Sequence, residues 1–420
     1  MDFLHSEIGS AKDNFHSPIH NWYKFTAGFS YKFVESILDE ELKTAQPIVF
    51  EPFAGCGTTL VSCQKKGINA IGNEGQELML DVIKAKLNWD IDEIKCLENL
   101  NILHEFVNSN LSSYDIEGNT HTLLQSLYTP DTLKILYLIR DGLNVVESEN
   151  YKIFFKLALS QTMHKSSIHP IAVPYISRTK TLSNDGHPWE KFQTIVLQML
   201  KDIKPLKKAP ITTEVYLHDS RLINEQILES SCNICITSPP YLNNLDYGEV
   251  SKVHTHFFEI TNNWNDITTK VRKNLVTGAT THYKETDFNL DQLKKSEFAK
   301  ENKDVFEKLC QTFIQIHDIS KTRKGKKSFD ILMMHYFVDM YFVLKEMRRV
   351  LSPNSKAYLI LGDSAPYGVF VPTTDILGQI SKSVGFDSYQ IFKIRTRGTK
   401  WKSLKNRHSL ELAENLLVLQ

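Results

Sequence analysis

The chain has 420 residues, of which 41% are hydrophobic, 10% aromatic and 23% charged. This composition is typical of a globular protein with ample material for a core, and it excludes disordered and fibrous classes. The 49 basic and 49 acidic residues give a formal net charge of zero, so any contact with a nucleic acid must come from local basic patches.

Targeting and metal-binding signals are missing from the sequence, which predicts a cytoplasmic protein. The first residues lack a basic segment followed by an apolar run, and no stretch of about 18 apolar residues could span a bilayer. Of six cysteines, only Cys232 and Cys235 form a CxxC pair. Because no second pair or histidine cluster completes a tetrahedral site, we expect two core residues there and no metal.

Short apolar segments followed by helical patterns predict an α/β fold with a mostly parallel sheet. An amphipathic helix is expected over 340–351, and a final antiparallel pair is expected to close the sheet. The predicted strands are 47–51, 69–74, 215–217, 233–237, 356–364, 386–394 and 414–420.

Two gaps between these strands are far longer than ordinary loops. About 140 residues separate the second strand from the third, and about 115 separate the fourth from the fifth. We therefore predict one α/β domain, formed by residues 1–80, 211–260 and 335–420, that is interrupted twice. The insertion 81–210 is rich in helical patterns, whereas 261–334 is polar and basic.

A glycine-rich loop follows the first strand. Glycines let the backbone approach a ligand closely, and the helix that follows presents its N-terminus, so a nucleotide-like ligand is expected. The spacing differs from the GxGxxG of dinucleotide folds and from the P-loop. The loop residues are Glu51, Pro52, Phe53, Ala54, Gly55, Cys56, Gly57, Thr58 and Thr59.

Polar residues at the next strand ends extend this candidate ligand site. Glu74 ends the second strand, where its carboxylate can accept both hydroxyls of a ribose. Asp219 and Ser220 follow the third strand and are expected near an adenine ring. For Asp219, a simple turn-opening role is an equal alternative.

The loop resembles the D-P-F-x-G-x-G-T-T cofactor loop of AdoMet-dependent DNA amino-methyltransferases, with Glu51 in place of the usual Asp. That resemblance implies a Rossmann-like class I methyltransferase fold with seven strands, the last antiparallel, and S-adenosyl-L-methionine as cofactor. The segment 20–38 is similar to the family's N-terminal cofactor segment, with Phe29 as the expected aromatic contact. A helix packed on the sheet explains that segment almost as well.

Ser238, Pro239, Pro240 and Tyr241 follow the fourth strand, where open α/β sheets bind ligands. They match the family's S-P-P-Y motif, which implies a catalytic role. The proline pair removes N–H donors and stiffens the chain, so the Ser238 hydroxyl and the Pro239 carbonyl can accept hydrogens of an amine. Tyr241 offers a flat face on which an extruded base can stack.

Within the family, S-P-P-Y is associated mainly with cytosine N4 methylation, which we therefore favour over adenine N6. Cytosine C5 methylation is excluded because the chain has no Pro-Cys dipeptide to supply its nucleophile. The cofactor loop precedes S-P-P-Y, unlike the permuted order common in S-P-P-Y enzymes. Which insertion recognises the target therefore stays open.

Residues after S-P-P-Y resemble a subgroup of bacterial DNA methylases with S-P-P-Y-x-N-x-x-D-Y. Asn243, Asp246 and Tyr247 are accordingly candidates for substrate contact. Asp246 and Tyr247 can shape a base pocket, or they can cap and pack the following helix. Asp363, after the fifth strand, can likewise line the pocket or form a turn.

Two basic stretches are candidates for contact with the DNA backbone. Residues 321–327 contain five positive charges, and residues 388–410 contain seven without any acid. A solvated loop is the alternative for the first, and the role of 277–283 is open. The candidate DNA contacts are Lys321, Arg323, Lys324, Lys326, Lys327, Arg395, Arg397, Lys400, Trp401 and Lys402.

The sequence thus favours a base-flipping DNA methyltransferase that acts on double-stranded DNA, with a restriction endonuclease as possible partner. Adenine N6 methylation and methylation of an RNA base amine are the alternative activities. A catalytically inert DNA-binding subunit is the non-enzymatic alternative. It is disfavoured because such a subunit has no reason to keep both the glycine loop and S-P-P-Y.

Overall fold

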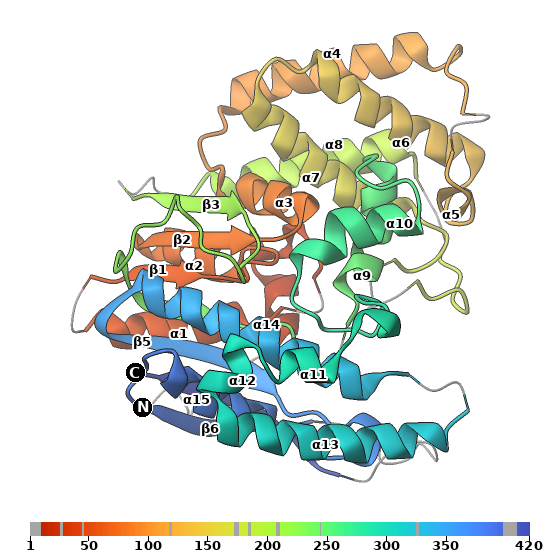
Figure 1. Cartoon of the computed structure of the whole chain (residues 1–420). Coiled ribbons are helices and arrows are strands. Elements are labelled where there is room, and N and C mark those ends of the chain that lie inside the picture. The colour runs from red at the N-terminus through yellow and green to blue at the C-terminus, as the bar shows by residue number, and fades with distance from the viewer. Residues whose placement is uncertain are drawn as a thin grey trace.

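The structure is a computed structural model that describes residues 10–25, 28–43, 46–116, 120–171, 176–183, 186–206, 211–243, 245–324, 327–397 and 410–420 (Figure 1). Its centre is a seven-stranded sheet with the order β3-β2-β1-β4-β5-β7-β6. The strands are β1 (Ile48–Glu51), β2 (Asn69–Glu74), β3 (Thr213–Leu217), β4 (Cys232–Thr237), β5 (Leu351–Gly362), β6 (Tyr389–Arg397) and β7 (Leu412–Leu419).

Strand directions confirm the predicted fold class. The first five strands pair in parallel, and β7 pairs antiparallel with both β5 and β6. Parallel neighbours bring the carboxyl ends of β1, β2, β3 and β4 to one edge. The segments after these strands, which carry most of the predicted site residues, therefore lie along the same edge.

Alternating side chains along the central strands enter two separate cores. In β5, Tyr358 and Ile360 face one side, whereas Leu359 and Leu361 face the other. Apolar residues on both faces are what a parallel sheet covered by two helical layers requires. Helices α1 (Tyr31–Glu41) and α2 (Thr58–Lys66) contribute to the first core, and α14 (Phe329–Val350) and α15 (Thr373–Ser383) to the second.

A third core lies among the helices between β2 and β3 (Figure 1). Trp22 from the N-terminal segment joins this core, and its indole N–H donates to Asp202 at 2.8 Å. The main helices are α3 (Glu77–Leu87), α4 (Glu93–Asn110), α6 (Pro130–Gly142), α7 (Glu149–Ser166) and α8 (Pro188–Ile203).

The second long connection, between β4 and β5, is also structured. It contains α9 (Tyr247–Phe257), a run of short helical turns and α13 (Lys303–Lys321), which packs beside α14. None of the helices in the described parts of the chain combines the length and apolar character needed to cross a membrane.

Several predicted boundaries were wrong. The helix expected over 340–351 begins at Phe329, because its first half is buried on most sides and shows no polar face from which a period could be read. β5 begins at Leu351 rather than 356 and ends at Gly362 rather than 364. β6 lies three residues later than predicted, and β7 begins two residues earlier and ends one residue earlier than predicted.

Two leucines on α8 test the packing of the third core. Leu200 is 6% exposed and Leu197 is 45% exposed on the same helix. We expect Leu200→Ala to lower the free energy of unfolding by about 2–5 kcal/mol, because the substitution leaves a cavity. Leu197→Ala is the matched control and should change that energy by less than about 0.5 kcal/mol. Urea unfolding measures both, and equal losses would contradict the described packing.

Candidate active site

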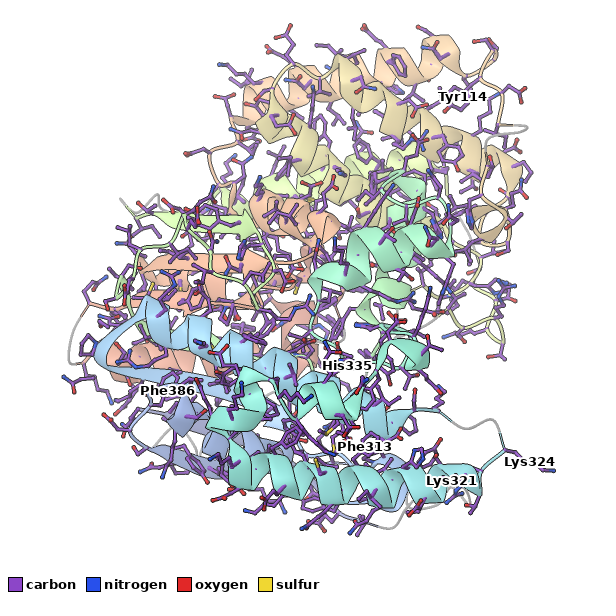
Figure 2. All side chains as sticks on the ribbon, in the orientation of Figure 1. Tyr114, Phe313, Lys321, Lys324, His335 and Phe386 are labelled. Atoms are coloured by element: carbon purple, nitrogen blue, oxygen red, sulfur yellow. The ribbon has the colours of Figure 1, made fainter. Side chains whose placement is uncertain are left out.

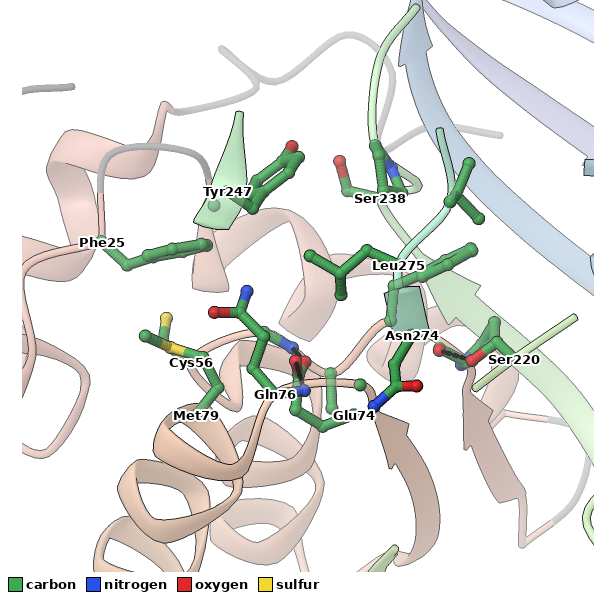
Figure 3. A pocket seen from close by; sticks show the side chains of 18 of the residues that line it. Phe25, Cys56, Glu74, Gln76, Met79, Ser220, Ser238, Tyr247, Asn274 and Leu275 are labelled. Atoms are coloured by element: carbon green, nitrogen blue, oxygen red, sulfur yellow. Dashed lines mark hydrogen bonds between the residues drawn. The ribbon is translucent and has the colours of Figure 1, made fainter. Parts of the chain in front are cut away.

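A cavity of about 770 Å³ opens at the carboxyl edge of the sheet (Figure 3). Its walls come from the N-terminal segment, the glycine loop, the ends of β2, β3 and β4, and residues 274–276 of the second insertion. With Tyr247 of α9, residues from seven segments of the sequence therefore meet here.

The glycine loop forms the floor of the cavity. Gly55 and Gly57 have φ values of 54° and 83°, and Gly57 is the N-cap of α2. These left-handed conformations suit glycine and turn the chain sharply from β1 into the helix. Beneath the loop, the buried Lys86 ammonium donates to the carbonyls of Cys56 at 3.0 Å and His20 at 3.2 Å. No local sequence pattern indicated this anchor.

Glu51 supports the loop from below and is not among the residues that line the cavity. Its carboxylate accepts from the Phe53 backbone at 3.0 Å, from Thr59 at 2.7 Å and from Thr237. Burial raises the pKa of Glu51 to about 8, and the three hydrogen bonds oppose that shift. Gly57 and Thr59 likewise support the cavity without lining it.

Glu74 lies in the cavity wall at the end of β2 (Figure 3). One carboxylate oxygen accepts from the Gly55 backbone at 2.7 Å and the other from the Gln76 backbone at 2.9 Å. Each oxygen keeps acceptor capacity for a further donor. Burial raises the pKa of Glu74 to about 7, although these backbone hydrogen bonds lower it.

Apolar side chains make up much of the remaining wall. Phe29 lines the cavity as a member of the predicted aromatic segment, and so does Phe25, which the sequence interpretation overlooked. Phe25 lies beside Tyr247 with 6.4 Å between ring centroids. Met79 adds a further apolar contact from α3. Phe25 belongs to the same aromatic run as Phe29, so the signal was present but was assigned to one residue.

The end of β3 joins the cavity to the second insertion. Asp219 lines the cavity, but its carboxylate is held by Arg221 at 2.6 Å, and the Ser220 hydroxyl donates to the Pro52 carbonyl.

Arg221 also donates to the Lys273 carbonyl at 2.6 Å. Asp339 of α14 accepts from Arg221 at 3.2 Å and from the Thr277 backbone at 2.8 Å. These bonds hold residues 274–276 against the cavity, and they give a role to Lys273 and Thr277 that sequence reasoning left open.

Ser238 and Pro240 of the S-P-P-Y segment line the cavity beside the glycine loop, whereas Pro239 and Tyr241 are not among its lining residues. The Ser238 hydroxyl donates to the Ile360 carbonyl at 3.2 Å, so its lone pairs are available to accept. The Tyr241 hydroxyl donates to Glu414 at 2.9 Å. Burial and the Glu414 carboxylate raise the pKa of Tyr241, which keeps the phenol protonated.

The residues after S-P-P-Y separate into different roles. Tyr247 lines the cavity, whereas Asn243 is exposed with a φ of 57°. Asp246 is buried, caps α9 through the Glu249 backbone, and forms an ion pair with Arg272 at 2.6 Å. Arg272 is itself buried and lies 4.2 Å from the Trp264 ring. Of the two interpretations, the geometry agrees with capping and packing for Asp246.

The first basic stretch lies at the end of α13. Figure 2 shows Lys321 and Lys324 there, on the side toward which the arrowheads of β2 and β3 point. Lys321 pairs with Asp318 at 3.0 Å, and Arg323 lies 6.0 Å from the Tyr367 ring. The Lys327 backbone donates to the Tyr367 hydroxyl at 2.7 Å, which ties the stretch to the loop after β5. Lys326 lies outside the described residues.

The second basic stretch contacts the S-P-P-Y segment directly. Arg395 forms an ion pair with Glu414, the residue that also accepts from Tyr241. The Arg397 guanidinium lies 4.8 Å from the centroid of the Tyr241 ring. These two arginines therefore have partners within the protein. Three further candidates, Lys400, Trp401 and Lys402, lie outside the described residues.

Metal ligands do not gather anywhere in the described residues: no group of three or more His, Cys, Asp or Glu side chains is arranged to hold an ion. Cys232 and Cys235 are buried in β4, which confirms the prediction that they are core residues. Burial raises the pKa of the Cys232 thiol to about 11.

The buried ion pair of Asp246 and Arg272 gives a test of this site. We expect Asp246→Asn to lower the free energy of unfolding by about 3–5 kcal/mol at pH 7, because a buried arginine loses its partner. Burial alone would raise the pKa of Asp246, but hydrogen bonds from Arg272 and Thr281, together with the nearby His282 ring, outweigh burial and hold that pKa below its ordinary value. The difference in free energy of unfolding between the wild-type protein and Asp246→Asn should therefore be full above about pH 4 and shrink as the pH falls further.

Asp291→Asn is the control, because Asp291 is 84% exposed and pairs with Lys294 on the surface. Urea unfolding of both variants between pH 3 and pH 8 measures the effect. A small, pH-independent loss in Asp246→Asn would contradict the described ion pair.

Comparison with known proteins adds relatives of nearly full length. The chain is 21% identical to Type II methyltransferase M.BsoBI of Geobacillus stearothermophilus over 93% of its own length and 83% of the relative's. It is 20% identical to Type II methyltransferase M.AvaI of Anabaena variabilis, over 94% of its own length and 84% of the relative's. It is 21% identical to Type II methyltransferase M.MvaI of Kocuria varians, over 84% of its own length and 77% of the relative's.

No protein-family model matches the chain, and no solved structure does. The seven-stranded sheet with its antiparallel β7 is consistent with a class I methyltransferase fold. In sequence, the chain is similar over most of its length to proteins that carry the name Type II methyltransferase.

Proposed function

We propose that this protein is a site-specific DNA methyltransferase that transfers a methyl group from AdoMet to the exocyclic amine of an extruded base. The observation that carries the proposal is one cavity lined both by the glycine loop with Glu74 and by Ser238 and Pro240. A methyl donor and an amine acceptor must meet within reaction distance, and a shared cavity satisfies that requirement. The similarity to Type II methyltransferases supports the same activity.

The residues of the cavity fit AdoMet. Glu74 has acceptor capacity on both oxygens, which suits two ribose hydroxyls. Phe25, Phe29 and Met79 supply apolar contacts for a purine ring, and the turn at Gly55 lets a ligand approach the backbone. The bound cofactor would supply an activated methyl group on a sulfonium.

Ser238 is the proposed catalytic residue. Its hydroxyl hydrogen is directed to the Ile360 carbonyl, so its oxygen can accept a hydrogen of the target amine. That contact draws the nitrogen lone pair out of conjugation with the base ring and stabilises the positive charge that develops on nitrogen. Pro239 supports this arrangement because it has no N–H to compete. Tyr241 would stack on the base.

Double-stranded DNA is the proposed substrate, with a restriction endonuclease as the proposed functional partner. Lys324 and Arg323 follow α13 near the loop after β5 and would contact phosphates. The helices between β2 and β3 and the connection between β4 and β5 flank the cavity edge and would read the target sequence. Cytosine N4 is the proposed target atom, on the resemblance of S-P-P-Y.

The deciding experiment incubates the protein with labelled AdoMet and unmethylated DNA, then digests the DNA and identifies the labelled nucleoside. We expect N4-methylcytosine. Label in N6-methyladenine would overturn the target base, label only in RNA would overturn the substrate class, and no label in any nucleic acid would overturn the activity.

Substitution of Ser238 tests the catalytic assignment. We expect Ser238→Ala to lower kcat by about 10²-fold or more, because an acceptor that acts in the transition state is lost. Ser231→Ala, just before the opposite end of β4, is the matched control and should leave kcat unchanged. Single-turnover methyl transfer measures both. A Ser238→Ala variant with the wild-type rate would show that the pocket is wrongly assigned.

Glu74 should make AdoMet binding depend on pH. Hydroxyl donors favour the ionised carboxylate, and the pKa of Glu74 is raised to about 7, so affinity should increase between pH 6 and pH 8. The increase cannot exceed about tenfold per pH unit. In the absence of ligand, the pH dependence of stability has the opposite sign. The contribution of Glu74 to the free energy of unfolding should fall as the pH rises from about 4 to about 7, because the folded state holds the Glu74 proton more tightly than the unfolded state.

Calorimetric titration with AdoMet at several pH values measures this dependence. Glu74→Gln should bind more weakly and with little change across this range. An affinity that is flat or falls with pH in the wild-type protein would contradict the role of Glu74 as acceptor.

A further inference from the structure

We propose that the Arg397 guanidinium is a placeholder, which covers the aromatic face of Tyr241 until the target base displaces it. This inference rests on the proposed function, because it assumes that a base stacks on Tyr241. It adds a residue of β6 to the events that control entry of the base. It also gives a role to a basic residue, predicted to contact DNA, that instead lies on an aromatic ring of the protein itself.

The position of Arg397 is the first observation. Its guanidinium carbon lies 4.8 Å from the centroid of the Tyr241 ring, which is a stacking contact. The same side chain lies over Gly362 at the end of β5, where a methyl group would come within 3.0 Å of the guanidinium carbon and collide with Nη1. A base and this guanidinium therefore cannot share that face of the ring.

The ring beneath Arg397 is held firmly. Tyr241 packs against the core under α14, and its hydroxyl donates to Glu414 at 2.9 Å. Glu414 is buried and forms an ion pair with Arg395, so the acceptor at the far end of the ring is itself fixed. The ring face toward Arg397 is the one that the guanidinium covers.

The cover is held by stacking and electrostatic attraction, and not by a hydrogen bond within the described residues. Within the described residues, no carboxylate or carbonyl accepts a hydrogen bond from the Arg397 guanidinium, whereas Arg395, two residues earlier, has Glu414. The nearby Asp363 carboxylate accepts from Thr374 at 3.3 Å and from Asn415 at 3.3 Å, and it attracts the Arg397 guanidinium electrostatically without accepting a hydrogen bond from it. A guanidinium carries five donors, and leaving the ring would free all of them for other acceptors.

Bound DNA supplies such acceptors. A guanidinium that leaves Tyr241 can form two hydrogen bonds with a phosphate, while the extruded base takes over the ring. One stacking contact is exchanged for another, and the arginine gains hydrogen bonds. The exchange would keep the aromatic face covered in the free protein and would link opening of the pocket to contact with the DNA backbone.

Three variants separate this role from alternatives. Arg397→Ala removes the placeholder, and Gly362→Ala displaces the guanidinium while keeping its charge. Lys382→Ala is the matched control, because it removes an exposed cation 5.7 Å from the Tyr389 ring, outside the cavity. Circular dichroism and AdoMet titration first establish that each variant is folded and binds cofactor.

The experiment begins by sequencing host DNA modified by the wild-type protein, which gives the methylated position. A duplex then carries a fluorescent analogue there, pyrrolocytosine for cytosine or 2-aminopurine for adenine, and stopped-flow fluorescence gives the extrusion rate at saturating DNA. We expect that rate to rise about 2-fold to 30-fold in Arg397→Ala, as loss of one cation–π contact predicts. It should also rise in Gly362→Ala and stay unchanged in Lys382→Ala.

Salt dependence of DNA binding supplies a second readout. Arg397→Ala should reduce the slope of log affinity against log salt by about one, whereas Gly362→Ala should keep it. An unchanged or slower extrusion rate in folded Arg397→Ala would overturn the placeholder role, since an arginine that clamps the base would slow extrusion when removed. Absence of methylated host DNA would instead overturn the proposed function.

Discussion

The buried carboxylate of Glu51 holds together the parts on which the cavity depends. It joins the end of β1 to the start of α2 through Thr59 and to the end of β4 through Thr237. The glycine loop and the S-P-P-Y segment are more than 170 residues apart, and these two hydroxyls set their spacing. A methyl donor on one and an amine on the other would be aligned only if that spacing is kept, since small displacements are costly in a transfer reaction.

The second insertion completes the cavity through ion pairs that span the fold. Arg221 and Asp339 hold the segment around Lys273 and Thr277 in place, and the pair of Asp246 and Arg272 anchors the same segment to α9. In both pairs each charge faces an opposite charge, which is the condition under which burial of Asp246 and Arg272 is tolerated. A region whose sequence looks polar and irregular therefore becomes a fixed wall beside the proposed cofactor site.

Ion pairs within the protein reduce the number of basic side chains that are available to DNA. Lys321 and Arg395 are each neutralised by an acid, and Arg397 lies on an aromatic ring. A count of basic residues along the chain overestimates the charge that is free to meet a phosphate. The proposed attraction to DNA would come from Arg323, Lys324 and any cation released from an internal contact, and it would be strongly screened by salt.

The sequence by itself determined the fold class and most of the cavity's polar residues. The ends of three strands can be predicted where apolar runs reach Glu51, Glu74 and Ser238. This works because the periodicity of apolar residues and the positions of glycines are visible in a short stretch of sequence. Only the tertiary structure decided that Glu51 lies under the cavity, that Phe25 and residues 274–276 line it, and that Lys86 anchors the loop. It also decided that Arg397 covers Tyr241. These contacts join residues that are distant along the chain, and no local pattern encodes which of several carboxylates or cations will meet.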